Sequence, residues 1–191
     1  MSNVKSYTDN QLLNRVKSLQ GFKQIPADVW ILGVRSNEDE SNVFDDKFYI
    51  FRGSKFLMVT SGTTNPSIDY LTNRMNKRGA FIIKSDMWHY DLWKPGKHKG
   101  RMDALVQNTA VIGFRDANKN KFSEEVGKVV SGWYGINFHA STYNTFNKVA
   151  TKFIGLWSAG CQVVNDRQKY NEIIELVKKQ KSVTYCLLKE F

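Results

Sequence analysis

The spacing of apolar residues predicts two helices that each present one apolar face. Residues 7–19 place apolar side chains at helical spacing, and either Thr8 or Asp9 can cap the first turn. Gly21 and Pro26 then interrupt this pattern, and a second run of helical spacing follows Asp166 near the C-terminus. The apolar positions are Leu12, Leu13, Val16 and Leu19 in the first helix, and Tyr170, Ile173, Ile174 and Val177 in the second.

Shorter apolar runs between these helices predict strands. Residues 47–52 and 55–60 flank a turn at Gly53 and Ser54, so we expect a hairpin there. Loops and turns are expected at 62–66, before a polar and helical stretch, and at 116–121. Residues 88–101 mix aromatic and basic side chains with proline and glycine, and this mixture is typical of an exposed functional loop. The other strand-like runs are 28–34, 79–83, 105–114 and 182–191.

Many strands and about three helices, without regular alternation, indicate a β-rich α+β fold. The length of 191 residues fits a single domain spanning 1–191, with residues 1–25 as an N-terminal helical extension. Hydrophobic residues make up 41% of the chain, and this share excludes a disordered protein.

The chain is basic, with 28 Lys and Arg residues against 18 Asp and Glu and a formal net charge of +10. Such a field attracts polyanions: nucleic acid, an anionic membrane surface or the acidic polymers of a bacterial wall. The sequence has no run of five or six like charges, and no window with the roughly 20 apolar residues of a membrane span. The first 20 residues carry no apolar signal core, so we expect synthesis in a cytoplasm without an export signal.

Two cysteines are too few for a disulfide framework, and we expect free thiols. Cys186 lies in an apolar run and is expected to be a buried core residue. Cys161 is flanked by Gly160 and Gln162 and is the candidate nucleophile, with His139 as its candidate base. Gly160 allows a sharp bend that turns peptide N–H groups toward a developing oxyanion. The spacing alone favours neither a catalytic nor a purely structural role for Cys161.

Residues 157–162 (WSAGCQ), preceded by 135–139 (GINFH), resemble the catalytic motif of the L,D-transpeptidases. In that motif a His is followed, after a loop, by Ser or Thr, any residue, Gly and Cys. The form found here is most similar to a divergent branch among phage-type peptidoglycan enzymes. Segments typical of that branch occur in order: GTTNP at 62–66, HKG at 98–100, and Arg-Asp-x-Asn at 115–118. The resemblance covers the chain from about residue 28 onward.

This resemblance implies a β-sandwich or barrel with peripheral helices, and a cysteine enzyme that acts on peptidoglycan stem peptides. Cys161 would attack a stem-peptide carbonyl to form a thioester, and His139, oriented by the backbone carbonyl of Ala140, would carry the proton. Ser158 is the hydroxyl residue of the motif and Gly160 precedes the nucleophile. An amine acceptor then gives transpeptidation, and water gives cleavage. The lack of an export signal favours a phage lysis or virion enzyme, or a toxin delivered to the wall, and with it hydrolysis.

Three positions depart from the family pattern. Ala159 stands where the family often has His or Arg, and Val163 replaces the usual Arg or Asn. His139 is followed by Ala140 rather than by Gly or Ser. These changes put transpeptidation in doubt more than they put cysteine chemistry in doubt.

Four side chains are candidate substrate-binding groups. The basic ones can hold a stem-peptide carboxylate or form a solvated loop. No dinucleotide or phosphate-binding glycine pattern is present, and no zinc spacing, so we expect no cofactor. Residues 116–120 begin like a calcium loop, but Lys121 and Gly127 occupy positions that need Gly and Glu, so we expect no metal. The four candidates are His98, Lys99, Arg101 and Trp157.

Two other functions remain open. A basic nucleic-acid-binding or virion structural protein would tolerate Cys161→Ala and would bind DNA with a steep salt dependence. An inactive protein of the same fold would serve as a wall-binding module. The favoured interpretation has peptidoglycan stem peptides as the partner, with no nucleic acid and no membrane span, and leaves the oligomeric state open.

Overall fold

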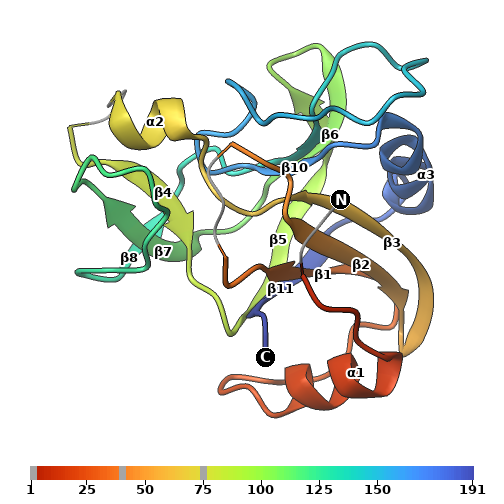
Figure 1. The fold of residues 1–191 in the computed structure, drawn as a ribbon. Coiled ribbons are helices and arrows are strands. Elements are labelled where there is room, and N and C mark those ends of the chain that lie inside the picture. Colours follow the sequence, from red (N-terminus) through yellow and green to blue (C-terminus); the bar gives the residue numbers. More distant parts are fainter. Residues whose placement is uncertain (1–3, 39–41, 74–76) are drawn as a thin grey trace.

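The computed structural model describes residues 4–38, 42–73 and 77–191 of the chain (Figure 1). The described residues contain three helices, α1 (Asp9–Lys17), α2 (Ile68–Thr72) and α3 (Arg167–Val177). They also contain eleven strands: β1 (Val29–Arg35), β2 (Asp46–Arg52), β3 (Lys55–Thr63), β4 (Ala80–Ile83), β5 (Met87–His98), β6 (Met102–Gln107), β7 (Val111–Asp116), β8 (Val130–Gly132), β9 (Phe138–Ala140), β10 (Gln162–Val164) and β11 (Val183–Lys189).

Eight of these strands close into a barrel in the order β1-β11-β5-β6-β9-β10-β3-β2. The pairs β1·β11 and β9·β10 are parallel, and the other neighbours in the barrel are antiparallel. The remaining strands form a smaller antiparallel sheet, β4-β7-β8, which lies beside the barrel (Figure 1). Helices α1 and α3 lie at the periphery (Figure 1). The expectation of a β-rich α+β chain with peripheral helices is confirmed.

The alternation of strand residues divides the core into two layers. Ile31 belongs to the larger cluster, which includes the apolar face of α3, whereas its neighbours Trp30 and Leu32 belong to a second cluster beneath α1. In α1, Leu12 and Val16 are fully buried against this second layer. Burial of a side chain of this size stabilises the fold by about 2 kcal/mol. Residues 4–25 therefore carry a helix that covers one face of the barrel.

Local sequence signals place both longer helices correctly. Thr8 caps α1 and forms a capping box with Gln11, in which each side chain bonds the other residue's backbone N–H. Asp166 caps α3 by accepting hydrogen bonds from the N–H groups of Gln168 and Lys169. The hairpin over residues 47–60 is also confirmed as β2 and β3, although β3 extends to Thr63 and so includes the first two residues of the expected 62–66 loop.

The expectation of an exposed loop at 88–101 is wrong, because most of this segment forms β5, the longest strand described. Trp88 and Trp93 are buried in the core. Pro95 is tolerated because β5 pairs with β11 only as far as Trp93 and has β6 as its one partner beyond that point. The run at 105–114 is also divided, into β6 and β7.

No helix in the described part of the chain combines the length and apolar character needed to cross a membrane.

Candidate active site

The parallel pairing of β9 and β10 brings the predicted nucleophile and base together. His139 lies in β9 opposite Val163 of β10, and Cys161 immediately precedes β10. A ring nitrogen of His139 and the Sγ atom of Cys161 lie within 4.8 Å of each other. Both side chains are largely buried, with His139 fully enclosed and Cys161 8% exposed. A cysteine and a histidine 22 residues apart in the sequence thus share one small site.

The tautomer of His139 is fixed by the backbone of the next residue. Its Nδ1 atom lies 2.9 Å from the carbonyl oxygen of Ala140, which only accepts hydrogen bonds. Nδ1 therefore carries the proton, and Nε2 has a free lone pair. Nε2 is buried and has no hydrogen-bond partner among the described residues. The imidazole is thus held in the form of a base whose basic nitrogen is left for the thiol.

Burial keeps both members of the pair neutral. It lowers the pKa of His139 to about 3, and the nearby His98 and Lys99 also lower it, against an opposing effect of the hydrogen bond to the Ala140 carbonyl. Burial raises the pKa of the Cys161 thiol, partly offset by the Asn137 N–H and the charge of Lys99. At neutral pH the resting pair is therefore a thiol and an imidazole rather than a thiolate–imidazolium ion pair.

Gly160 is required immediately before the nucleophile. Its φ of +122° is one that side-chain-bearing residues rarely adopt, and a Cβ there would lie 2.4 Å from the carbonyl oxygen of Phe81 in β4. The bend at Gly160 therefore depends on the absence of a side chain. The smaller sheet, through Phe81, forms one wall of the nucleophile loop.

Ser158 anchors this loop from within and is fully buried. Its Oγ accepts a hydrogen bond from Gly160 N and lies 2.8 Å from the carbonyl oxygens of Asn65 and Cys161, to either of which it can donate. Its own carbonyl accepts a hydrogen bond from Ser67 N at 2.8 Å. The motif serine therefore positions the Cys161 backbone and ties it to the 62–66 segment.

Asn137 links three parts of the site and was not predicted from the sequence. Its backbone N–H lies 3.5 Å from Cys161 Sγ, and its carbonyl accepts the Gln162 N–H at 2.9 Å. Its side-chain Oδ1 accepts the Gln107 N–H, so the amide Nδ2 faces Nδ1 of His98 at 3.1 Å. Two of these four bonds use the backbone, which any residue type supplies, so the sequence carried little signal for this position.

His98 contacts the candidate base His139 directly, which its predicted role in substrate binding did not imply. Its ring stacks on that of His139, with centroids 4.0 Å apart and planes inclined by 25°. It reaches the pair from the end of β5, at the tight turn that contains Lys99. Lys99 is exposed and acts on the pair through its charge. His98 and Lys99 therefore border the pair.

The other two predicted substrate-binding residues, Trp157 and Arg101, lie on the outer side of the Cys161–His139 pair. The half-buried Trp157 has its ring centroid 6.3 Å from that of His139 and 5.1 Å from that of Tyr143. Arg101 is exposed, with its guanidinium 6.0 Å from the Tyr143 ring centroid. Both residues therefore reach the site through one aromatic cluster, in which Arg101 is the more distant member.

His98, His139 and Cys161 offer three ligand atoms within 4.8 Å of one another, a donor set that zinc uses. Sequence spacing gave no sign of this cluster. The hydrogen bonds suit a metal poorly, because the Asn137 amide occupies Nδ1 of His98 as a donor and so leaves the proton on Nε2. The arrangement fits proton transfer between Cys161 and His139 better than metal ligation.

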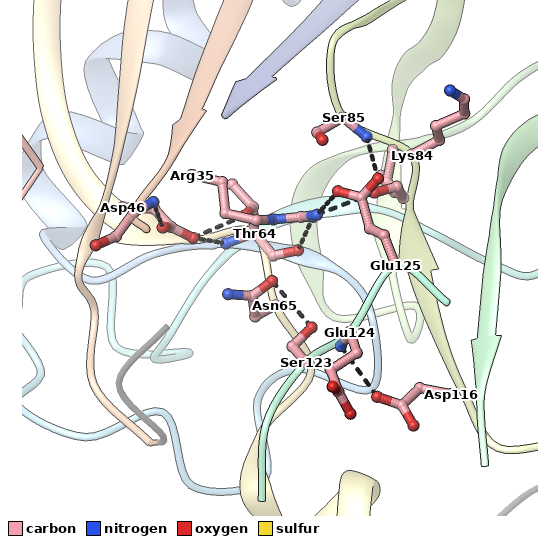
Figure 2. A network of polar contacts seen from close by, with 12 residues as sticks. Arg35, Asp46, Thr64, Asn65, Lys84, Ser85, Asp116, Ser123, Glu124 and Glu125 are labelled. Carbon is pink, nitrogen blue, oxygen red and sulfur yellow. Dashed lines mark hydrogen bonds and ion pairs between the residues drawn. The ribbon is translucent and has the colours of Figure 1, made fainter. Parts of the chain in front are cut away.

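A buried polar network fixes the 62–66 segment against which the nucleophile loop rests (Figure 2). Arg35 forms an ion pair with Glu125 at 2.6 Å and donates to both Oγ1 and the carbonyl oxygen of Thr64. The fully buried Asp46 accepts hydrogen bonds from Thr64 N and Oγ1. Thr64 also accepts from the side chain of Gln162, directly after the nucleophile. The network therefore connects the barrel, the loop before β8 and the Cys161 loop.

Comparisons with protein-family models, with curated proteins and with solved structures give no match for this chain. The assignment to the L,D-transpeptidase family accordingly remains a prediction based on the motif residues. What the structure defines is a buried cysteine–histidine pair in a closed barrel, with His139 in β9 and Cys161 directly before β10, the parallel neighbour of β9.

Proposed function

We propose that this chain is a cysteine enzyme that cleaves or exchanges peptide bonds in the stem peptides of peptidoglycan. The observation that carries this proposal is the oriented His139, whose Nδ1 faces the Ala140 carbonyl while its unpartnered Nε2 remains for the thiol of Cys161. A histidine that serves only as a packing residue has no need of a buried nitrogen without a partner. Such an atom on a ring that shares a small site with a thiol is what a general base requires.

The neutral pair sets the order of the chemical steps. Nε2 of His139 takes the thiol proton as Sγ attacks the carbonyl carbon of the stem peptide, so charge develops only when substrate is present. The imidazolium then donates this proton to the departing amine, and a thioester to Cys161 is left. Attack on the thioester by water gives a shortened peptide, and attack by an amine gives an exchanged or cross-linked one.

The backbone N–H of Cys161 is the candidate oxyanion donor in this scheme. The N–H of Gly160, the other candidate, already donates to Ser158 Oγ at 3.2 Å. Donors that stabilise the tetrahedral intermediate must be held in place before the reaction. Ser158 provides this by fixing the turn that contains both residues.

The substrate class rests on the motif resemblance. The ordered set of GTTNP, HKG and Arg-Asp-x-Asn segments accompanies the Ser-x-Gly-Cys step. The first of these contacts the nucleophile loop through Asn65, and Ser67, directly after the segment, contacts it as well. Of the departing positions, Val163 is fully buried in an apolar cluster with Phe44 and Ile154, whereas Ala159 is exposed. Position 159 is therefore the departure that alters the surface offered to substrate.

The test is mass spectrometry of purified peptidoglycan fragments incubated with wild type and with Cys161→Ala. Stem peptides shortened or exchanged only by the wild type support the proposal, and the mass change distinguishes hydrolysis from transpeptidation. Cys186→Ala is the matched control, since it removes the other, core thiol. Fragments left unchanged by every protein contradict the proposal.

A further inference from the structure

A cavity of about 360 Å³ opens next to the nucleophile loop, between the smaller sheet and the segment before β9. Its wall includes Ala159, two residues before Cys161, and Tyr134, which precedes Gly135 in the chain. The carbonyl oxygen of Gly135 lies 3.6 Å from Cys161 Sγ. Two sides of this cavity are thus continuous with residues that adjoin the thiol.

Arg115 of β7 supplies the positive charge of the cavity. Its guanidinium lies 4.4 Å from the ring centroid of Tyr134 and 5.3 Å from that of Phe81, and it donates one hydrogen bond to the Gly79 carbonyl. These cation–π contacts with the two rings hold the planar group in place. None of the ion pairs within residues 4–38, 42–73 and 77–191 includes Arg115.

The position of Arg115 suits an anionic group on a bound peptide. An extended peptide advances about 3.3 Å per residue, so a chain whose carbonyl lies at Cys161 places a group one or two residues away in the neighbouring cavity. A guanidinium forms paired hydrogen bonds with a carboxylate, which match its planar shape. The aromatic rings can cover the apolar part of the same residue. A carboxylate is therefore the group that this cavity fits best.

We propose that the Arg115 cavity binds a free carboxylate of the peptide that Cys161 attacks, within two residues of the scissile carbonyl. This inference rests on the proposed function, since it assumes a peptide at Cys161. It gives Arg115 the role of a specificity residue, which selects substrates with an unmodified carboxylate near the cleaved bond. Val163, where the motif usually has a basic or amide residue, is buried away from this cavity.

The first arm measures binding, so that it does not depend on turnover. Calorimetric titration of Cys161→Ala uses a stem tetrapeptide with free carboxylates and versions with each carboxylate amidated in turn. We expect one amidated version to bind about tenfold more weakly, as loss of one charged hydrogen-bonded pair predicts. Adding Arg115→Gln should remove this difference, and adding Arg115→Lys, which keeps the charge, should retain part of it. Adding Arg52→Gln, an exposed change of the same charge on β2, should leave the difference intact.

The second arm measures cleavage or exchange of the same peptides by wild type and by Arg115→Gln, with circular dichroism to confirm that each variant is folded. Turnover by the wild type with an unchanged preference in Arg115→Gln overturns the cavity assignment and leaves the proposed function standing. No turnover together with an Arg115-dependent binding preference overturns the function and keeps the cavity as a carboxylate site. Equal binding of all peptides to the Cys161→Ala protein overturns the cavity assignment.

Discussion

The imidazole rings of His98 and His139 lie face to face, with centroids 4.0 Å apart. Two stacked imidazoles are unfavourable as a pair of cations, because a charge on one ring opposes a charge on the other. His98 is accordingly the second cause, after burial, that lowers the pKa of His139. Burial of both side chains, together with this neighbour, explains how His139 stays a neutral base instead of forming an ion pair with the thiol.

The neutral pair predicts a specific pH dependence for alkylation of Cys161 by iodoacetamide. Because burial raises the pKa of this thiol, thiolate forms only as the pH rises past its ordinary value of about 8.5, and the rate should increase above that pH. His139→Gln should leave the pH midpoint of this increase in alkylation rate nearly unchanged while abolishing turnover at pH 7. Rapid alkylation at pH 5 that is lost in His139→Gln would instead show a resting ion pair and contradict this account.

The two cysteines should differ in reactivity in the folded protein. Cys161 has 8% of its surface exposed, whereas Cys186 is fully buried in β11 beneath α1. Iodoacetamide at pH 9 should modify Cys161 at least about tenfold faster than Cys186 in native buffer, and both equally in urea. Peptide mapping by mass spectrometry after timed quenching measures both rates. Faster modification of Cys186 than of Cys161 in native buffer would show that helix α1 does not cover Cys186.

Ser158 should be needed for stability as well as for activity. Ser158→Ala leaves the buried Gly160 N–H without its partner and removes the hydroxyl that faces the Asn65 and Cys161 carbonyls. The free energy of unfolding should fall by about 1–3 kcal/mol, as measured by urea denaturation. Ser131→Ala, at an exposed position on β8, is the matched control and should change the same quantity by less than about 0.5 kcal/mol. Equal effects would remove the anchoring role from Ser158.

The Arg35–Glu125 pair offers a test of the network in Figure 2. Its side chains are 5% and 12% exposed, and Glu125→Gln removes the ion-pair partner of the buried guanidinium. We expect a loss of about 3 kcal/mol in unfolding free energy by urea denaturation. The exposed pair Lys97–Asp103, disrupted by Asp103→Asn, should cost less than about 1 kcal/mol. A loss at Glu125 no greater than at Asp103 would mean that the network adds little to the fold.

Features that depend on neighbouring residues could be predicted from the sequence. The cap of the first helix, for which Thr8 was one of two candidates, the helix after Asp166 and the turn between β2 and β3 are local, and all three are present. The closure of the barrel through β1 and β11 pairs residues about 150 positions apart, and no local pattern encodes such a pairing. The same limit explains the error at 88–101, where Pro95 and Gly96 obscured the strand pattern of β5.

The predictions for the site divide in the same way, into local features that the sequence indicates and long-range contacts that it does not. The motif residues Cys161, His139, Ser158 and Gly160 lie close together in the structure, because His139 is in β9 and the other three come just before its partner β10. Their catalytic roles stay a prediction. Asn137 was missed because half of its bonds use its backbone. His98 was predicted to contact substrate, and its stacking on His139 follows from the β5–β6 turn, whose position only the folded barrel determines.

The most direct test of the central claim is to trap the covalent intermediate. Wild-type protein mixed with a stem tetrapeptide, quenched in acid within seconds and digested should yield a peptide containing Cys161 with the added mass of the acyl fragment. Cys161→Ala should show neither this adduct nor any change in the tetrapeptide, and His139→Gln should accumulate little or no adduct. An unmodified Cys161 together with a tetrapeptide that is neither shortened nor exchanged would contradict the account.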